Sequence, residues 1–211
     1  MIIDPTTLAT FVTACVAVYV TPGVDMAYIA SNSVNSGVRG GLWAAAGTVI
    51  GVSTQALLAA LGVTAVFAAS PIVFEAVRWV GVVYLAYLGV RLLLSNEPVD
   101  WHRDSPSWSP WPAVLKGMAI NLLNPKVALF FVAFLPQFVD PGSGPVFPQL
   151  AFLGSVFALG SILWCAFLAV LFARIGDRFR TSTTFLSWQR RVTGTAFVGF
   201  AGLLAAADLR R

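Results

Sequence analysis

The chain has 211 residues, of which 58% are hydrophobic and 10% are charged, and its mean hydropathy is +0.82. Soluble domains carry about 25% charged residues, so this chain has too few of them to cover a globular surface. The net charge is +4, and most of the Arg and Lys residues lie in short loops beside apolar segments. No basic helix or aromatic RNA-binding motif accompanies them, so a nucleic-acid partner is not expected and a lipid bilayer is.

Six segments approach the roughly 20 mainly apolar residues that a membrane-spanning helix needs. They cover residues 6–30, 42–69, 72–94, 113–138, 147–173 and 191–207. The sequence therefore predicts an all-α membrane protein, with six transmembrane helices in a single transmembrane domain. Because the N-terminus lacks the basic region and small-residue cleavage site of a signal peptide, the first segment is expected to remain as a span.

Metal and disulfide chemistry have little support in the sequence. Cys15 and Cys165 both fall inside predicted spans, where small packing residues are a better interpretation than a disulfide pair. The single histidine, His102, lies in the polar stretch between the third and fourth segments. No metal site and no cofactor are therefore expected.

Two of the apolar segments are interrupted by proline. The first carries Thr21-Pro22-Gly23-Val24-Asp25, and the fourth carries Asn124-Pro125-Lys126. Proline lacks a backbone N–H and clashes with the preceding turn, and glycine adds backbone freedom, so both helices should break. The protein is expected to be organised around these two breaks.

Each break carries a charge where water should be scarce. Asp25 is the only carboxylate well inside a span, and Lys126 is the only cation at the centre of one. Each costs roughly 3 kcal/mol on insertion scales and should face the bundle interior. They could form a structural ion pair, or Asp25 could cap its own half-helix. Alternatively, Asp25 meets a substrate ammonium or a coupling proton, and Lys126 attracts a substrate carboxylate or sets the proton affinity of Asp25.

Three amides accompany these charges. Asn121 and Asn124 flank the second break and could bind substrate or satisfy the backbone groups that Pro125 frees. Gln55, in the second segment, could be an interhelical hydrogen-bond partner or a ligand. The same segment contains Gly47-x-x-x-Gly51, a pattern that permits close approach of another helix.

The two halves of the chain show a weak internal repeat. Aligning Pro22 with Pro125 also matches Tyr28 with Phe131, and similar matches relate residues 78–89 to 191–202. The predicted units are a first three-helix repeat (1–94), a cytoplasmic linker (95–112) and a second three-helix repeat (113–211). Because three spans is an odd number, the second repeat would be inverted in the bilayer. An inverted 3+3 repeat with broken helices 1 and 4 is a known design of secondary transporters.

Basic residues predict the orientation of the chain. The loops after the first, third and fifth segments hold nine of them, whereas the remaining ends and loops hold three: Arg78, Arg210 and Arg211. Because basic loops stay in the cytoplasm, both termini are expected outside.

The breaks also carry a family resemblance. The relevant blocks are Thr21-Pro22-Gly23-x-Asp25-Met26, the glycine-rich stretch 40–62, Val83-Tyr84-Leu85-x-Tyr87-Leu88-Gly89 and Lys116-Gly117-x-x-x-Asn121-Leu122-x-Asn124-Pro125-Lys126. Over nearly the whole chain, they resemble the LysE/RhtB family of bacterial amino-acid exporters. The resemblance implies efflux of amino acids or close derivatives across the cytoplasmic (inner) membrane, driven by proton motive force.

Two positions depart from the family pattern. Val24 stands where a second proline is often found, so a milder first break is expected. Gln55 stands near a position where the family commonly has a histidine, so a proton role does not carry over to it. Members of the family differ in the amino acid they prefer, and the resemblance does not identify the substrate.

The sequence as a whole predicts a secondary transporter and not an enzyme. An intramembrane hydrolase needs paired Asp residues, a Ser–His pair or a metal triad, and the spans contain none of these. The expected activity is amino-acid export by proton antiport. The alternatives are an exporter of another small solute and a non-transporting membrane scaffold, and a homo-oligomer is left open. The predicted substrate and proton site comprises Pro22, Gly23, Asp25, Gln55, Asn121, Asn124, Pro125 and Lys126.

Overall fold

The computed structural model describes residues 3–94 and 109–175, together with residues 191, 194–195, 198–199 and 201–202. These ranges contain helices and no strand, which confirms the predicted all-α class. The elements are α1 (Pro5–Val20), α2 (Val24–Ala69), α3 (Pro71–Leu94), α4 (Pro110–Leu122), α5 (Pro125–Leu129), η1 (Phe130–Phe134), η2 (Leu135–Phe138), η3 (Pro141–Ser143) and α6 (Val146–Ile175). Most of the predicted linker and of the sixth span lies outside the described residues.

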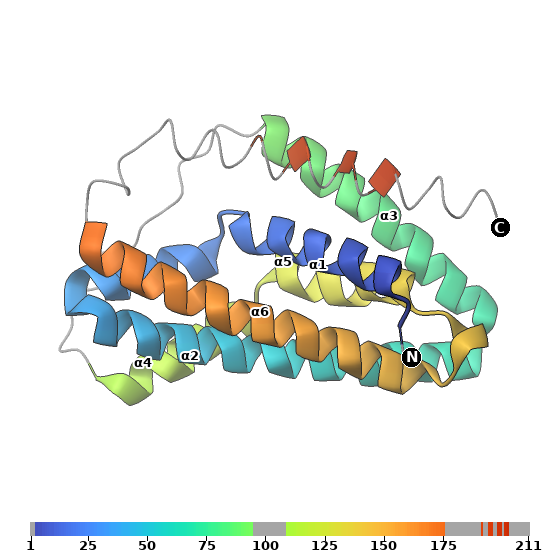
Figure 1. Ribbon diagram of the computed structural model, residues 1–211, viewed down its shortest axis with the longest axis horizontal. Helices are drawn as coiled ribbons and strands as arrows, with labels where there is room; N and C mark the ends of the chain where they lie inside the picture. The colour runs from blue at the N-terminus through green and yellow to red at the C-terminus, as the bar shows by residue number, and fades with distance from the viewer. Residues whose placement is uncertain are drawn as a thin grey trace.

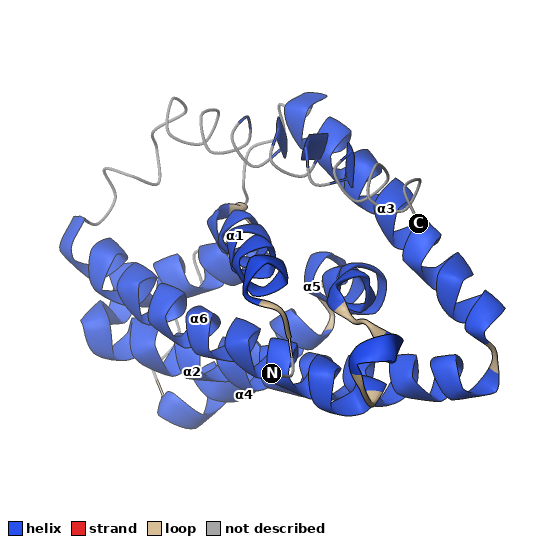
Figure 2. Ribbon diagram, turned by 45° about the vertical axis from the view of Figure 1, so that its right-hand side comes forward, coloured by secondary structure: helices blue, strands red, loops and turns tan. Residues whose placement is uncertain are grey.

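The long helices α2 and α6 lie side by side, and α1 and α5 both lie on one side of them (Figure 1). The turned view shows α3 running along the outer edge of this group, beyond α5 (Figure 2). Helix α3 contacts the group through η1 and α2. The interior of the bundle is therefore built from α1, α2, α4, α5 and α6, together with η1 and η2, which continue from α5.

The first predicted break is present between α1 and α2. Helix α1 begins with Asp4, whose carboxylate accepts hydrogen bonds from the Thr6 hydroxyl and the Thr7 N–H; these bonds hold the pKa of Asp4 below its usual value. The helix ends at Val20, and Thr21 and Gly23 are extended, with φ of −60° and −163°. Helix α2 then starts at Val24.

The turn between the first and second predicted spans is shorter than expected. The first two predicted segments leave residues 31–41 between them, but only Ser36 and Gly37 leave the helical conformation, and helix resumes at residue 38. Gly37 has φ of +65°, in the left-handed region that favours glycine. One left-handed residue is enough to reverse the chain, so the helix reforms before the remaining glycines (Figure 1).

The second predicted break is also present. Helix α4 ends at Leu122, α5 begins at Pro125, and the two sections of this segment are bent by 58°. Beyond α5 the helix continues as the π-helical turn η1 and the 3-10 helix η2. Helix α4 begins at Pro110, inside the linker predicted over 95–112, because a proline near the first turn loses no helical hydrogen bond.

Two helices in the described ranges are long and apolar enough to cross a membrane: Val24–Val66 and Val146–Ile175. The bent pair Pro110–Leu122 and Lys126–Phe138 would be a third if it forms one broken span, and Pro5–Val20 is a shorter apolar helix. These helices support a membrane protein.

The glycine pair in α2 brings α4 to backbone distance. A Cβ atom built on Gly47 would lie 2.1 Å from the backbone oxygen of Val114, and one on Gly51 would lie 2.8 Å from the Cβ of Asn121. On α4, a Cβ built on Gly117 would lie 2.7 Å from the backbone oxygen of Ala44. The close approach that the sequence predicted for Gly47 and Gly51 is confirmed.

Aromatic side chains fill the space between α1, η1, η2 and α6. The Phe130 ring lies 4.8 Å from the Phe134 ring and 5.1 Å from the Phe157 ring, measured between centroids. Phe11 of α1 packs edge-on against Phe138 at 5.2 Å. This cluster fixes the helix segment that follows the second break against α1 and α6.

We expect Gly47→Ala to destabilise the protein, because its Cβ would meet the backbone of α4. Overpacking of this kind costs about 1–3 kcal/mol. The control is Gly62→Ala on the same helix, where a Cβ meets nothing within 4 Å and the better helix propensity of alanine should add up to about 1 kcal/mol. Thermal unfolding in detergent, followed by tryptophan fluorescence, measures both. Equal midpoints for the two variants would contradict the close contact.

Candidate functional site at the two helix breaks

The two breaks, far apart in the sequence, lie against each other in the structure. The Asn124 side-chain Nδ2 donates a hydrogen bond to Asp25 Oδ2 at 2.7 Å. The Lys126 Nζ donates to the backbone oxygen of Thr21 at 3.2 Å. Each break therefore supplies a side chain that satisfies a polar group of the other.

Asn124 serves both sides of this contact. While its Nδ2 reaches Asp25, its Oδ1 accepts a hydrogen bond from the backbone N–H of Lys126 at 3.1 Å and so caps the N-terminus of α5. The side chain is 5% exposed. The sequence left two roles open for Asn124, substrate binding and hydrogen bonding to the backbone near Pro125. The structure shows the backbone role, and Asn124 also holds the carboxylate of the first break.

Asp25 lies in the first turn of α2, where the helix dipole favours a negative charge. It does not cap the helix, because the N-cap residue is Gly23 and no side-chain cap hydrogen bond is present. Its Oδ1 is buried and has no hydrogen-bond partner among the described residues. Asn124 therefore holds one oxygen of the Asp25 carboxylate, and the other oxygen can accept a hydrogen bond from a bound ligand.

Lys126 lies at the start of α5, directly over the first break. A Cβ built on Gly23 would lie 3.2 Å from the Lys126 Nζ, so the glycine leaves room for the ammonium. Within the described part of the chain, Lys126 and Asp25 form no direct ion pair: the ammonium binds Thr21 and the carboxylate binds Asn124. The two charges share one site without being joined.

A small polar chamber lies between the breaks and α6. Its walls include Thr21, Asp25, Asn121 and Lys126, and its volume is about 40 Å³. A cavity needs about 10–15 Å³ of this kind of volume to hold one water molecule, so the chamber has room for a few. Asn121 is fully buried, and both its Oδ1 and its Nδ2 lack hydrogen-bond partners in the described structure. Because buried polar groups are normally paired, these atoms can take part in binding.

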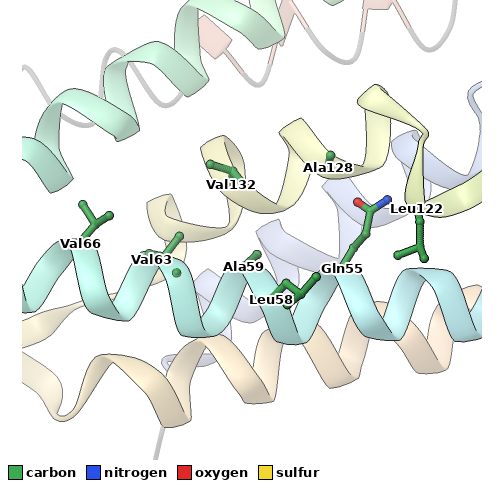
Figure 3. Close-up of a pocket in the computed structure, with 9 residues that line it drawn as sticks. Gln55, Leu58, Ala59, Val63, Val66, Leu122, Ala128 and Val132 are labelled. Carbon is green, nitrogen blue, oxygen red and sulfur yellow. The ribbon is translucent and has the colours of Figure 1, made fainter.

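Gln55 lies on the other side of Asn121. Its Nε2 donates a hydrogen bond to the Asn121 backbone oxygen at 2.5 Å, which joins α2 to the end of α4. This is the interhelical role that the sequence offered for Gln55. Gln55 does not line the polar chamber; it lies in the wall of a second, larger cavity (Figure 3).

The structure thus brings seven of the eight predicted residues to one place and sets the eighth apart. Pro22, Gly23 and Pro125 form the backbone breaks, and Asp25, Asn121, Asn124 and Lys126 supply the polar groups. Within the described ranges, no group of three or more His, Cys, Asp or Glu residues could hold a metal ion.

Several chamber residues did not emerge from the sequence. Ser161 and Cys165 of α6 form part of the far wall, with the hydroxyl 3.8 Å from the thiol. Their spacing of one helical turn in an apolar span was the available signal. Tyr19 of α1 also lines the chamber and donates a hydrogen bond from its hydroxyl to the Phe157 backbone oxygen at 2.5 Å. Nothing in the sequence marked Tyr19 as a residue of the site, since an aromatic residue near the end of a span is common.

Comparison with known protein families matches residues 16–208 to the LysE type translocators. The chain belongs to the LysE translocator family. This LysE-family protein is 34% identical over 216 residues to an uncharacterized membrane protein of Pseudomonas aeruginosa, a match that covers 95% of each chain. It is 29% identical over 197 residues to the leucine efflux proteins of Salmonella typhimurium and Salmonella typhi, covering 93% of each chain. No solved structure matches it.

Membership of the LysE family makes the protein a membrane transporter and not an enzyme. The family resemblance seen in the sequence is thereby confirmed. The match to residues 16–208 includes both breaks and the chamber between them.

An exchange of donor and acceptor tests the Asn124–Asp25 hydrogen bond. Asn124→Asp keeps an oxygen to cap α5 but loses the donor and sets a second carboxylate against Asp25. We expect it to lower the free energy of unfolding by about 2 kcal/mol or more, the range for a buried group left unpaired. The double variant Asn124→Asp/Asp25→Asn reverses the donor and the acceptor and should recover most of that loss.

Thermal unfolding in detergent provides the measurement, with Asp25→Asn alone as the matched single variant. Because two amides can still form a hydrogen bond, Asp25→Asn should change stability little. A double variant no more stable than Asn124→Asp would contradict the proposed pairing.

Proposed function

We propose that this LysE-family protein exports amino acids or close derivatives across the bacterial cytoplasmic membrane in exchange for protons. The observation that carries the proposal is the meeting of two broken helices around Asp25 and Lys126 in a chain of the translocator family. Its similarity over 93% of each chain to proteins named for leucine efflux supports an amino acid as the exported solute.

We further propose that the chain forms six membrane spans, arranged as an inverted 3+3 repeat. Residues 1–94 and 113–211 would be the two repeats, joined by a cytoplasmic linker over 95–112, with both termini outside. The paired breaks support this arrangement, because each half has a broken apolar segment followed by a long helix, in α2 and in α6. The asymmetry of nine basic residues against three in the flanking loops supports the orientation.

We propose that Lys126 and Asp25 have different roles in the recognition of a zwitterionic amino acid. Lys126 and the N-terminus of α5 attract the substrate carboxylate, since free N–H groups and the positive end of a helix dipole favour an anion. Asp25 meets the substrate ammonium or carries the coupling proton. The absence of a direct ion pair between the two within the described structure supports these separate roles, because neither charge neutralises the other by contact.

The chamber volume of about 40 Å³ supports a closed conformation in this mechanism. Sites that hold small molecules typically have about 300–1,000 Å³, so the chamber is too small for an amino acid. Substrate would therefore enter only when the broken segments move apart, alternately toward each face of the membrane. Breaks in both segments provide the hinges for such movement.

We expect Asp25→Asn to remove proton coupling and leave the fold intact. Purified protein is reconstituted into liposomes, and amino-acid movement is measured under an imposed pH gradient and as counterflow without one. The gradient-driven component should fall to the level of empty liposomes, while counterflow persists. The matched control is Asp4→Asn, which keeps an oxygen at the exposed cap of α1 and should leave both components unchanged.

Unchanged gradient-driven transport in folded, inserted Asp25→Asn would show that this carboxylate does not couple protons. Failure of every amino acid to exchange in wild-type vesicles would instead contradict amino-acid export itself.

A further inference from the structure

A second cavity lies on the side of the Gln55–Asn121 contact away from the polar chamber. Its volume is about 460 Å³, within the roughly 300–1,000 Å³ typical of small-molecule sites. Figure 3 shows it between α2 below and the end of α4, α5 and η1 above. It is lined by Gln55, Leu58, Ala59, Gly62, Val63, Val66, Leu122, Ala128 and Val132.

The floor of this pocket is one face of α2. Gln55, Ala59, Gly62 and Val66 follow one another at intervals of three or four residues, the spacing that keeps side chains on the same side of a helix. A Cβ built on Gly62 would meet nothing within 4 Å, so the glycine widens the pocket. No charged side chain is among its lining residues.

One polar group interrupts this apolar surface. Gln55 is 7% exposed, and its amide projects from α2 toward Leu122 and Ala128 in Figure 3. Its Nε2 is engaged by Asn121, whereas its Oε1 is buried and has no hydrogen-bond partner among the described residues. A buried acceptor of this kind requires a donor, so the pocket suits a ligand that is apolar over most of its length and carries an N–H or O–H group at one end.

We propose that this pocket binds the aliphatic side chain of the exported amino acid, and that Gln55 Oε1, at the polar end of the pocket, accepts a hydrogen bond from its ammonium group. Of the two roles proposed for Asp25, this leaves the one of carrying the coupling proton. The inference rests on the proposed export function and narrows its substrate class to amino acids with large apolar side chains. A lipid acyl chain would fill the same volume but would leave Gln55 Oε1 without a donor. A charged side chain would carry its charge to the end of the pocket away from Gln55, where the lining residues are apolar and none can pair with it.

The wild-type protein gives the first test. Leucine counterflow into proteoliposomes is competed with unlabelled leucine, alanine, lysine and glutamate. Leucine should compete best, and lysine and glutamate should need concentrations at least about tenfold higher, because nothing in the pocket pairs with their charge. Equal competition by all four amino acids would overturn the proposal.

Filling the pocket from two walls gives the second test. Gly62→Leu narrows it from α2, and Val132→Phe narrows it from η1. Each should lower leucine counterflow by about tenfold or more and alanine counterflow by no more than about threefold, since a pocket discriminates by the methylene groups it can hold. Ala68→Leu is the matched control: it adds similar bulk at an exposed position of α2 outside the pocket and should change neither rate.

The possible results distinguish an error in the pocket proposal from an error in the export proposal. A leucine-to-alanine ratio that shifts in either folded wall variant, but not in Ala68→Leu, supports the proposal. An unchanged ratio in variants that still transport overturns it and leaves export standing; this is also the result expected if a lipid tail or a second copy of the chain covers the pocket. Wild-type vesicles that exchange no amino acid contradict both. If neither wall variant folds, the wild-type competition series decides.

Discussion

The hydrogen bond between Asn124 and Asp25 joins two places where helices stop inside an apolar protein. In a bilayer there is no water to satisfy the backbone groups that such breaks release, so the protein must provide partners for them. Here the second break supplies the partners of the first: Asn124 holds the Asp25 carboxylate, and Lys126 binds the Thr21 carbonyl. The second break also binds its own backbone, because Asn124 accepts from the Lys126 N–H. The first break therefore depends on the second.

This contact depends in turn on how closely the helices around it pack. Gly47 and Gly51 let α4 approach α2 at backbone distance, and Gly117 does the same from the other side. Small residues at such a seam are the usual means of bringing transmembrane helices together. The seam places Asn121 next to Gly51 and thereby sets the position of the second break along α2. The aromatic cluster around Phe130 then holds the segment beyond that break.

The sequence was a good guide to the places where regular structure fails. Pro22, Gly23 and Pro125 predicted both breaks, because proline and glycine act locally through the backbone. The close approach of α4 to Gly47 and Gly51 of α2 was predictable for the same reason, since it needs only the absence of a side chain. The connection left between the first two segments, residues 31–41, was too long, because several glycines follow one another there and only Gly37 adopts a left-handed conformation.

Partnerships across the bundle were harder to predict. The acceptor for Lys126 is a backbone carbonyl, which no residue type reveals, and Ser161 and Cys165 reach the chamber through the rotation of α6 about its axis. Gln55 was grouped with the charged residues, although Asn121 separates it from them. Its location depends on the depth at which α4 ends against α2, and that depth follows from three-dimensional packing.

The π-helical turn at Phe130–Phe134 has a consequence for the evolution of the chain. A π turn contains one more residue than the α turn it replaces. Deleting one residue there would restore a regular α turn and leave the residues after it on the same faces, whereas a deletion in a regular helix rotates everything after it by about 100°. Phe138 would then keep its place against Phe11. The π turn is therefore the position at which this segment can lose one residue with the least disturbance to its packing against α1.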